Sequence, residues 1–79
     1  MELYVGNLDY DISISELQDI FSQYGQITSV RRFIDCSTRQ RRDFGFVRMS
    51  TRKGGHQAIE GLNGKNVNNR NLIVNELVI

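Results

Sequence analysis

Apolar residues recur along this chain with two spacings, one typical of helices and the other of strands. Between residues 13 and 25, an apolar stripe at helical spacing is formed by Leu17, Ile20, Phe21 and Tyr24. The stretch opens with the pattern S-x-x-E at Ser13, which has the form of a capping box, so Ser13 is the expected N-cap. Gly25 follows the stripe and predicts a left-handed C-terminal cap. The pattern predicts a first helix between these two residues.

A second helix is expected after residues 50–51 and up to about Leu62. Its apolar anchors are Ala58, Ile59 and Leu62. Gly54 and Gly55 fall in its first half, and each costs up to about 1 kcal/mol relative to alanine. We therefore expect the first turn of this helix to be irregular or frayed.

Four short, β-prone segments predict strands, at residues 2–5, 27–34, 44–49 and 72–77. In the third, the period of two is plain: one face carries Arg42, Phe44, Phe46 and Arg48, and the other carries Gly45, Val47 and Met49. The second segment is less regular, because alternation puts Arg32 at an inward position. Such an arginine is tolerable on an edge strand, where its head can reach water. Residues 35–42 have the composition of a polar, basic hairpin connection.

The order of the expected elements is β-α-β-β-α-β, which predicts an α+β fold of the ferredoxin-like, split βαβ type. We expect one four-stranded antiparallel sheet with strand order 4-1-3-2 and both helices on one face. The opposite face is then left uncovered by the rest of the chain. Because the sequence has no proline, linker or repeat, residues 1–79 are expected to form a single domain.

Composition and charge narrow the classes of function. No apolar run approaches the roughly 20 residues that span a bilayer, so we expect no membrane association. The net charge is only +1, but eight of the ten basic residues fall in residues 31–53, whereas residues 1–30 hold five acidic residues and no Lys or Arg. Arginine forks suit phosphates and base edges, although a solvated charged loop would explain the cluster equally well. The single cysteine, Cys36, excludes an internal disulfide and favours a reducing, cytoplasmic setting.

Aromatic residues are expected to gather on the uncovered face of the sheet. If Leu3 and Val5 point into the core, alternation turns Tyr4 outward, as it does Phe44 and Phe46 in the third strand. When the first and third strands are neighbours, three rings stand together in solvent beside arginines. Such a cluster suits unstacked bases and their phosphates. The other readings are that the rings belong to the core or are covered by a partner helix.

The chain resembles the RNA-recognition-motif family over essentially its whole length. Residues 3–8 (LYVGNL) match the family's first-strand hexamer throughout. Residues 42–49 match its third-strand octamer, K/R-G-F/Y-G/A-F-V-x-F/Y, at six of eight positions, the free one included. The resemblance implies that Tyr4 and Phe46 stack under neighbouring bases. It also implies that Phe44 inserts between the two sugars and that Arg42 contacts the linking phosphate.

Further RNA contacts are expected at the edges of this group. The resemblance implies contacts to base edges at the end of the last strand, from Asn75 and Glu76. The electrostatic track is expected to be extended by Arg31, Phe33 and Arg48 on the outer face and by Arg39 and Arg41 in the hairpin loop.

Two positions depart from the family pattern. Asp43 replaces the usual glycine and sets a carboxylate beside Arg42, which would partly neutralise the phosphate site. Met49 replaces an aromatic residue at an inward position, which is a core exchange of modest consequence. Since the chain stops soon after the last strand, we expect modest affinity and a footprint of about two to four nucleotides. A first strand at the start of the chain suggests a free-standing protein similar to small one-domain bacterial RNA-binding proteins, with an excised module as the alternative.

The expected function is binding of single-stranded RNA, and more weakly of single-stranded DNA, by a monomer that serves post-transcriptional regulation or RNA chaperoning. A protein-interaction module is the alternative, because some domains of this fold bind peptides through the helical face or an altered sheet face. A protein partner on the helical face is compatible with RNA binding. No catalysis, metal or cofactor is expected, because Cys36 is alone, His56 has no ligand companion, and no nucleophile–base pair is visible.

Overall fold

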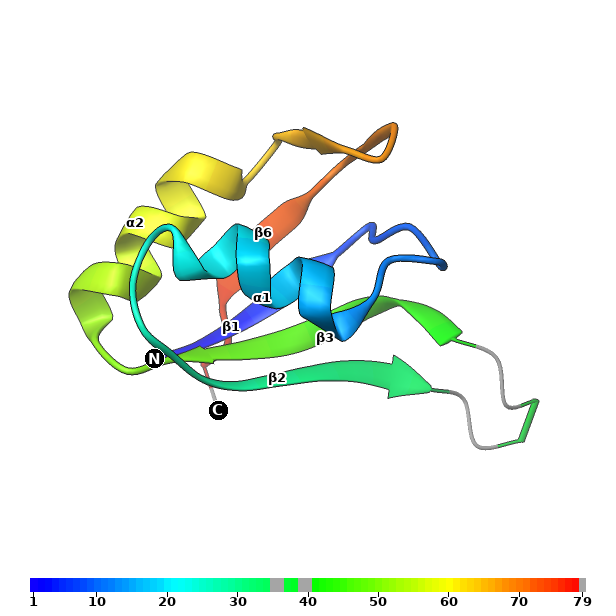
Figure 1. The fold of residues 1–79 in the computed structure, drawn as a ribbon, viewed down its shortest axis with the longest axis horizontal. Helices are drawn as coiled ribbons and strands as arrows, with labels where there is room; N and C mark the ends of the chain where they lie inside the picture. Colours follow the sequence, from blue (N-terminus) through cyan, green and yellow to red (C-terminus); the bar gives the residue numbers. More distant parts are fainter. Residues whose placement is uncertain (35–36, 39–40, 79) are drawn as a thin grey trace.

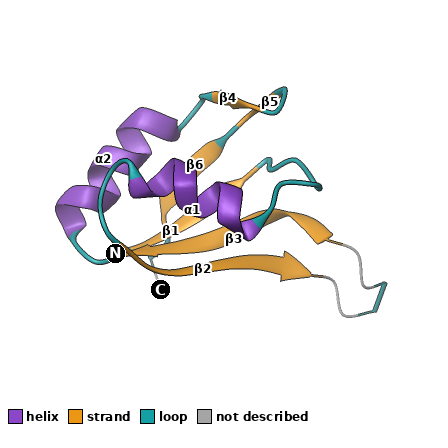
Figure 2. Ribbon diagram, viewed as in Figure 1, coloured by secondary structure: helices purple, strands orange, loops and turns teal. Residues whose placement is uncertain are grey.

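Two helices lie across one face of a four-stranded antiparallel sheet in the computed structural model of the chain (Figures 1 and 2). The structure describes residues 1–34, 37–38 and 41–78. Its elements are β1 (Glu2–Gly6), α1 (Ile14–Ser22), β2 (Ile27–Ile34), β3 (Arg41–Met49), α2 (Arg52–Leu62), β4 (Asn66–Val67), β5 (Arg70–Asn71) and β6 (Ile73–Glu76). The sheet has the order β2-β3-β1-β6, which confirms the expected 4-1-3-2 arrangement and the ferredoxin-like fold.

The core lies between the helices and the inward face of the sheet. In β1 and β3, apolar residues of one parity are buried, as alternation predicts: Leu3 and Val5 in β1, and Val47 and Met49 in β3. The buried apolar residues are Leu3, Val5, Leu8, Ile12, Leu17, Phe21, Val47, Met49, Ala58, Leu62, Leu72 and Val74. None of the three expected outward rings is among them. The interpretation that these rings belong to the core is therefore wrong.

Helix α1 begins as the sequence predicts and ends differently. The Ser13 side chain accepts a hydrogen bond from the Glu16 backbone N–H at 3.0 Å, which caps the helix. At the other end the C-cap is Gln23 in a right-handed conformation, so the expected left-handed cap at Gly25 is wrong. Gly25 has φ +158°, and a Cβ there would lie 3.2 Å from the Cα of Gly54. Its lack of a side chain serves the close approach of α2 to this loop.

The frayed first turn expected for α2 is also wrong. The Thr51 side chain accepts a hydrogen bond from Gly54 N–H at 3.0 Å, and the helix runs regularly from Arg52. Both glycines are buried. A Cβ on Gly55 would lie 2.3 Å from the sulfur of Met1. Close packing against the start of the chain thus offsets the low helix propensity of glycine.

Arg32 points inward from the edge strand β2, as alternation predicts, but its head does not rely on water. Its Nη1 donates to the carbonyl of Ile12 at 2.5 Å and its Nη2 to the carbonyl of Asp9 at 2.7 Å. The guanidinium therefore ties β2 to the loop that follows β1.

A two-stranded hairpin that the sequence analysis missed precedes the last strand. In it, β4 pairs with β5 antiparallel, and Val67 lies opposite Arg70. The two residues of its turn, Asn68 and Asn69, have φ values of +53° and +68°, as a type I′ turn requires. The last strand of the sheet accordingly spans Ile73–Glu76, shorter than the expected 72–77. Neither helix of the described chain is long and apolar enough to cross a bilayer.

Candidate nucleic-acid interface

The face of the sheet opposite the helices carries side chains in rows that cross the strands. In the central row, Tyr4 of β1 pairs with Phe46 of β3 on one side and with Asn75 of β6 on the other. Phe46 in turn pairs with Arg31 of β2. The four residues share the outward parity, since the neighbours of Tyr4 along β1 are buried. We call the outward side of the sheet the open face.

Aromatic rings form a continuous cluster on the open face. The ring centroids of Tyr4 and Phe44 lie 5.9 Å apart with an interplanar angle of 29°. Phe46 meets both of these rings more steeply, at 63° to Tyr4 and 78° to Phe44. A fourth ring, Phe33 of β2, stacks on Phe44 at 5.0 Å and 20°. The cluster therefore spans the three neighbouring strands β1, β3 and β2, whereas the three rings predicted from the sequence lie on β1 and β3 alone.

The rings are less exposed than expected. Tyr4, Phe44 and Phe46 are half-buried, whereas Phe33 at the margin of the cluster is 46% exposed. The reason is that the rings cover one another, at centroid distances typical of favourable aromatic pairs. Neither α1 nor α2 covers them, because these helices lie on the other face of the sheet (Figure 1).

Gly6 leaves room for the Tyr4 ring. A Cβ on Gly6 would lie 2.8 Å from both Cε1 and the hydroxyl oxygen of Tyr4. The ring thus leans along β1 over the glycine backbone. A side chain at this position would push the ring out of its orientation in the cluster.

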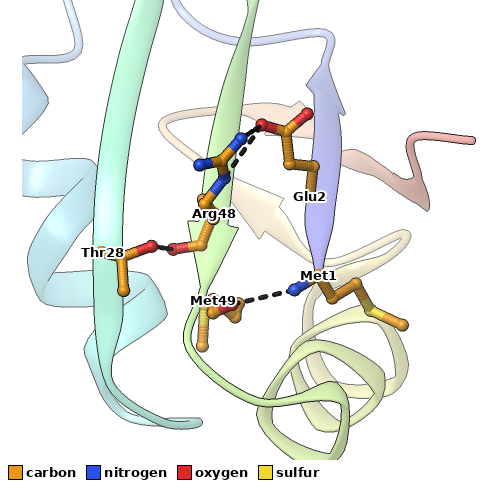
Figure 3. A network of polar contacts seen from close by, with 5 residues as sticks. All are labelled: Met1, Glu2, Thr28, Arg48 and Met49. Atoms are coloured by element: carbon orange, nitrogen blue, oxygen red, sulfur yellow. Dashed lines mark hydrogen bonds and ion pairs between the residues drawn. The ribbon is translucent and has the colours of Figure 1, made fainter. Parts of the chain in front are cut away.

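Arg48 is paired with a carboxylate that the sequence analysis left out (Figure 3). Its Nε donates to Glu2 Oε1 at 3.0 Å, and its Nη2 contacts the same oxygen. The two residues lie opposite each other in the register of β1 and β3. The Thr28 hydroxyl donates to the Arg48 carbonyl at 3.2 Å. Arg48 is therefore not an unpaired cation on the open face.

Of the other residues expected to contact RNA, some lie on the open face and others do not. Arg31 and Asn75 are exposed on the open face beside Phe46 and Tyr4. Glu76 is exposed but pairs with the inward residue Leu3, so its parity is that of the helical face. Arg39 and the side chains of Arg41 and Arg42 lie outside the described part of the chain. The predicted neutralisation of Arg42 by Asp43 therefore stays a prediction.

A hydrophobic residue at the margin of the open face was missed by the sequence analysis. Ile73 of β6 lies opposite Gly6 and is 46% exposed. No alternation in the sequence marked it, since Leu72, Ile73 and Val74 are consecutive apolar residues, and the structure shows that its two neighbours are buried. Its exposed aliphatic surface extends the apolar area beside Tyr4.

A polar cluster at the end of the sheet had no signal in the sequence. The Asn7 side-chain oxygen accepts from Arg70 Nε at 3.1 Å and from Nη2 at 2.6 Å, and Asn7 Nδ2 donates to the Asn71 carbonyl at 2.9 Å. The Arg70 guanidinium lies 5.7 Å from the centroid of the Tyr10 ring. These contacts fasten the β4–β5 hairpin to the loop after β1.

Metal-binding groups do not gather among the residues that the structure describes. Within these residues, no three His, Cys, Asp or Glu side chains lie close enough to hold an ion. His56 is exposed on α2, as expected of a surface residue. Cys36 lies outside the described residues.

Known proteins share this fold and these motifs. A family model described as RNA recognition motif matches residues 3–73. The protein RbpB of Nostoc sp. is 40% identical over 76 residues, which cover 96% of this chain and 74% of RbpB. The chloroplastic 28 kDa ribonucleoprotein of Spinacia oleracea is 40% identical over 73 residues, which cover 92% of this chain but only 31% of that protein. A crystal structure of RNA-binding protein PG1 superposes with a TM-score of 0.94 at 39% identity, over 100% of this chain and 95% of that one.

The fold and the open face define a ferredoxin-like domain with an aromatic sheet surface. The chain belongs to the RNA recognition motif family, because the family model covers most of its length. Its resemblance to bacterial RNA-binding proteins is confirmed by RbpB of Nostoc sp., which is named as an RNA-binding protein. RNA binding is the function that this membership supports, and the protein-interaction alternative is not favoured.

Proposed function

We propose that this chain binds single-stranded RNA on the open face of its sheet, by stacking bases on rings and contacting phosphates with arginines. The observation that carries the proposal is the cluster of Tyr4, Phe33, Phe44 and Phe46 on the face of the sheet opposite α1 and α2. A cluster of rings in partial contact with water exposes apolar surface that a folded monomer would otherwise bury. Stacked bases remove that surface from water, and each contributes about 1–3 kcal/mol.

The arrangement suggests a division of labour among the rings. Tyr4 and Phe46 stack under two neighbouring bases, and Phe44, which contacts all three other rings, lies between their sugars. Phe33 supports Phe44 and offers a further stacking surface above β2. Arg42 contacts the phosphate that links the two nucleotides.

The location of the site can be mapped directly. We expect a short uridine-rich RNA to shift the backbone amide resonances of β1 and β3 in nuclear magnetic resonance titrations, with little change in α1 and α2. The reason is that ring and phosphate contacts alter the local field on the open face alone. Shifts centred on the helices would contradict the proposal and favour a partner on the helical face.

Arg31 should contribute to affinity through charge. It is exposed beside Phe46, so Arg31→Ala should weaken binding to all RNA sequences alike and reduce the slope of log K against log salt by about 0.7, the value for one phosphate on a single strand. Arg52→Ala is the matched control, since Arg52 is exposed at the start of α2. Affinities measured by fluorescence anisotropy over a range of salt concentrations test this. An unchanged slope in the Arg31 variant would remove Arg31 from the phosphate track.

The proposal extends to the setting in which the chain acts. We propose a non-catalytic monomer of the cytoplasm that serves post-transcriptional regulation or RNA chaperoning. Single-stranded DNA would bind more weakly, because it lacks the 2′-hydroxyl group. The helical face stays available for a protein partner while RNA occupies the open face.

A further inference from the structure

Glu2 and Arg48 form a polar row directly beside the stacking rings. Glu2 precedes Tyr4 by two residues on β1, and Arg48 follows Phe46 by two residues on β3. Residues two apart on a strand share a face and lie about 7 Å from each other along it. A base stacked on Tyr4 or Phe46 therefore has an edge within reach of this row.

The ion pair is built so that hydrogen-bonding capacity remains on both partners. Both Arg48 donors, Nε and Nη2, contact the same oxygen, Oε1 of Glu2. Among the described residues, no hydrogen bond engages Glu2 Oε2 or Arg48 Nη1. The Arg48 side chain is 58% exposed and that of Glu2 is 25% exposed. A ligand on the open face can thus find acceptors on Glu2 and donors on Arg48.

The pair has no evident purpose as a stabilising contact or as a phosphate site. An exposed ion pair contributes about 0–1 kcal/mol to stability. A carboxylate on a surface that binds a polyanion repels phosphates, and here it also neutralises Arg48. The carboxylate becomes useful if it accepts hydrogen bonds from a base.

Guanine is the base whose edge complements this row. Its Watson–Crick edge presents, in order, the N2 amino group and N1–H, which are two adjacent donors, and then the O6 acceptor. A carboxylate accepts from both donors, and an adjacent guanidinium donates to O6. Adenine, cytosine and uracil each offer the carboxylate only one donor, with an acceptor beside it, so none of them can donate twice to Glu2.

We propose that Glu2 and Arg48 select guanine for one of the two nucleotides stacked on Tyr4 and Phe46, with Glu2 accepting from N1–H and the N2 amino group and Arg48 donating to O6. This inference rests on the proposed RNA-binding function and adds a base preference to it. Arg48 is then a specificity residue, while the phosphate contacts fall to other arginines.

Four five-nucleotide RNAs test the preference, each with uridines around one central guanine, adenine, cytosine or uracil. By fluorescence anisotropy, the protein should bind the guanine RNA on the order of tenfold more tightly than the other three, as expected for a two-bond base contact. Glu2→Gln should remove this preference without weakening the binding of the all-uridine RNA, because it takes away a carboxylate that repels phosphates and pairs with Arg48. Glu60→Gln, an exposed carboxylate on α2, is the control and should keep the preference.

Two guanine analogues identify the edge that is read. Inosine lacks the N2 amino group but keeps N1–H and O6, so it should bind more weakly than guanosine in the same RNA by roughly 2- to 10-fold, the value of one hydrogen bond. 7-Deazaguanosine lacks the N7 acceptor but keeps the Watson–Crick edge, so it should bind as guanosine does. The reverse result, with inosine tolerated and 7-deazaguanosine rejected, would overturn the role given to Glu2.

The outcomes separate this inference from the function on which it rests. Equal binding of all four RNAs, a preference for cytosine, or a guanine preference that survives in folded Glu2→Gln would overturn the inference. If Tyr4→Ala still abolished binding in these cases, RNA binding on the open face would stand. If none of the RNAs bound the folded protein, both proposals would fall together.

Discussion

Replacing Phe46 with alanine should weaken RNA binding by about 1–3 kcal/mol, the contribution of one base stacked on an aromatic ring. This corresponds to roughly a 5- to 150-fold rise in Kd. The physical reason is that Phe46 stands on the open face next to Tyr4 and Phe44, at ring distances of 6.3 and 5.9 Å, so its loss removes the surface under one base. Anisotropy titration with a short single-stranded RNA measures the effect.

The same variant should remain folded. Phe46 is half-buried by its neighbouring rings and takes no part in the core, so we expect to lose only aromatic pair contacts, each about 0.5–1.5 kcal/mol. Tyr10→Ala is the matched control: Tyr10 is 53% exposed, and it lies in the loop after β1 rather than in the ring cluster. An RNA affinity that fell equally in both variants, or stayed unchanged in the Phe46 variant, would argue against stacking on the open face.

Replacing Phe21 with alanine should have the largest effect on stability. Phe21 is fully buried on α1 within the core, and large-to-small substitutions of this kind cost about 3–5 kcal/mol. In a domain of this size each kcal/mol lowers Tm by about 4–8 °C. Thermal unfolding followed by circular dichroism should therefore show a fall of more than about 10 °C, or no folded protein at all.

Two further variants keep this prediction testable if Phe21→Ala does not fold. Phe21→Leu retains most of the buried volume and should cost less than the alanine variant. Ile14→Ala, on the same helix, removes an exposed side chain and should change Tm little. Stability that was insensitive to Phe21→Leu and Phe21→Ala alike would mean that α1 packs on the sheet by another face.

Phe21 and Phe46 have identical side chains, but Phe21 packs in the core and Phe46 lies on the open face. This difference in location was predictable from the sequence. Helical spacing assigned Phe21 to the apolar stripe of α1, and strand alternation assigned Phe46 to the outward face of β3. Both assignments agree with the burial in the structure. Local periodicity was sufficient because backbone geometry alone decides which side chains share a face.

Other features depended on contacts between distant parts of the chain. The expected irregularity of α2 followed from the low helix propensity of Gly54 and Gly55, yet the helix is regular, and Gly55 packs closely against Met1. Likewise, Arg48 was predicted to extend the electrostatic track on the outer face, and nothing near it in the sequence indicates that Glu2 lies opposite. Propensity and composition describe neighbours along the chain, and these contacts join residues more than forty positions apart.

By itself, the sequence determined the order of the two helices and the four strands of the main sheet, the inward and outward sides of β1 and β3, the outward rings at positions 4, 44 and 46, and the family. Only the tertiary structure decided that Phe33 joins the ring cluster, that Glu2 pairs with Arg48, and that Arg32 anchors the loop after β1. The physical reason is that alternation follows from the geometry of a single strand. The partners across the sheet follow from strand order, register and bulges, which are set when the whole chain packs.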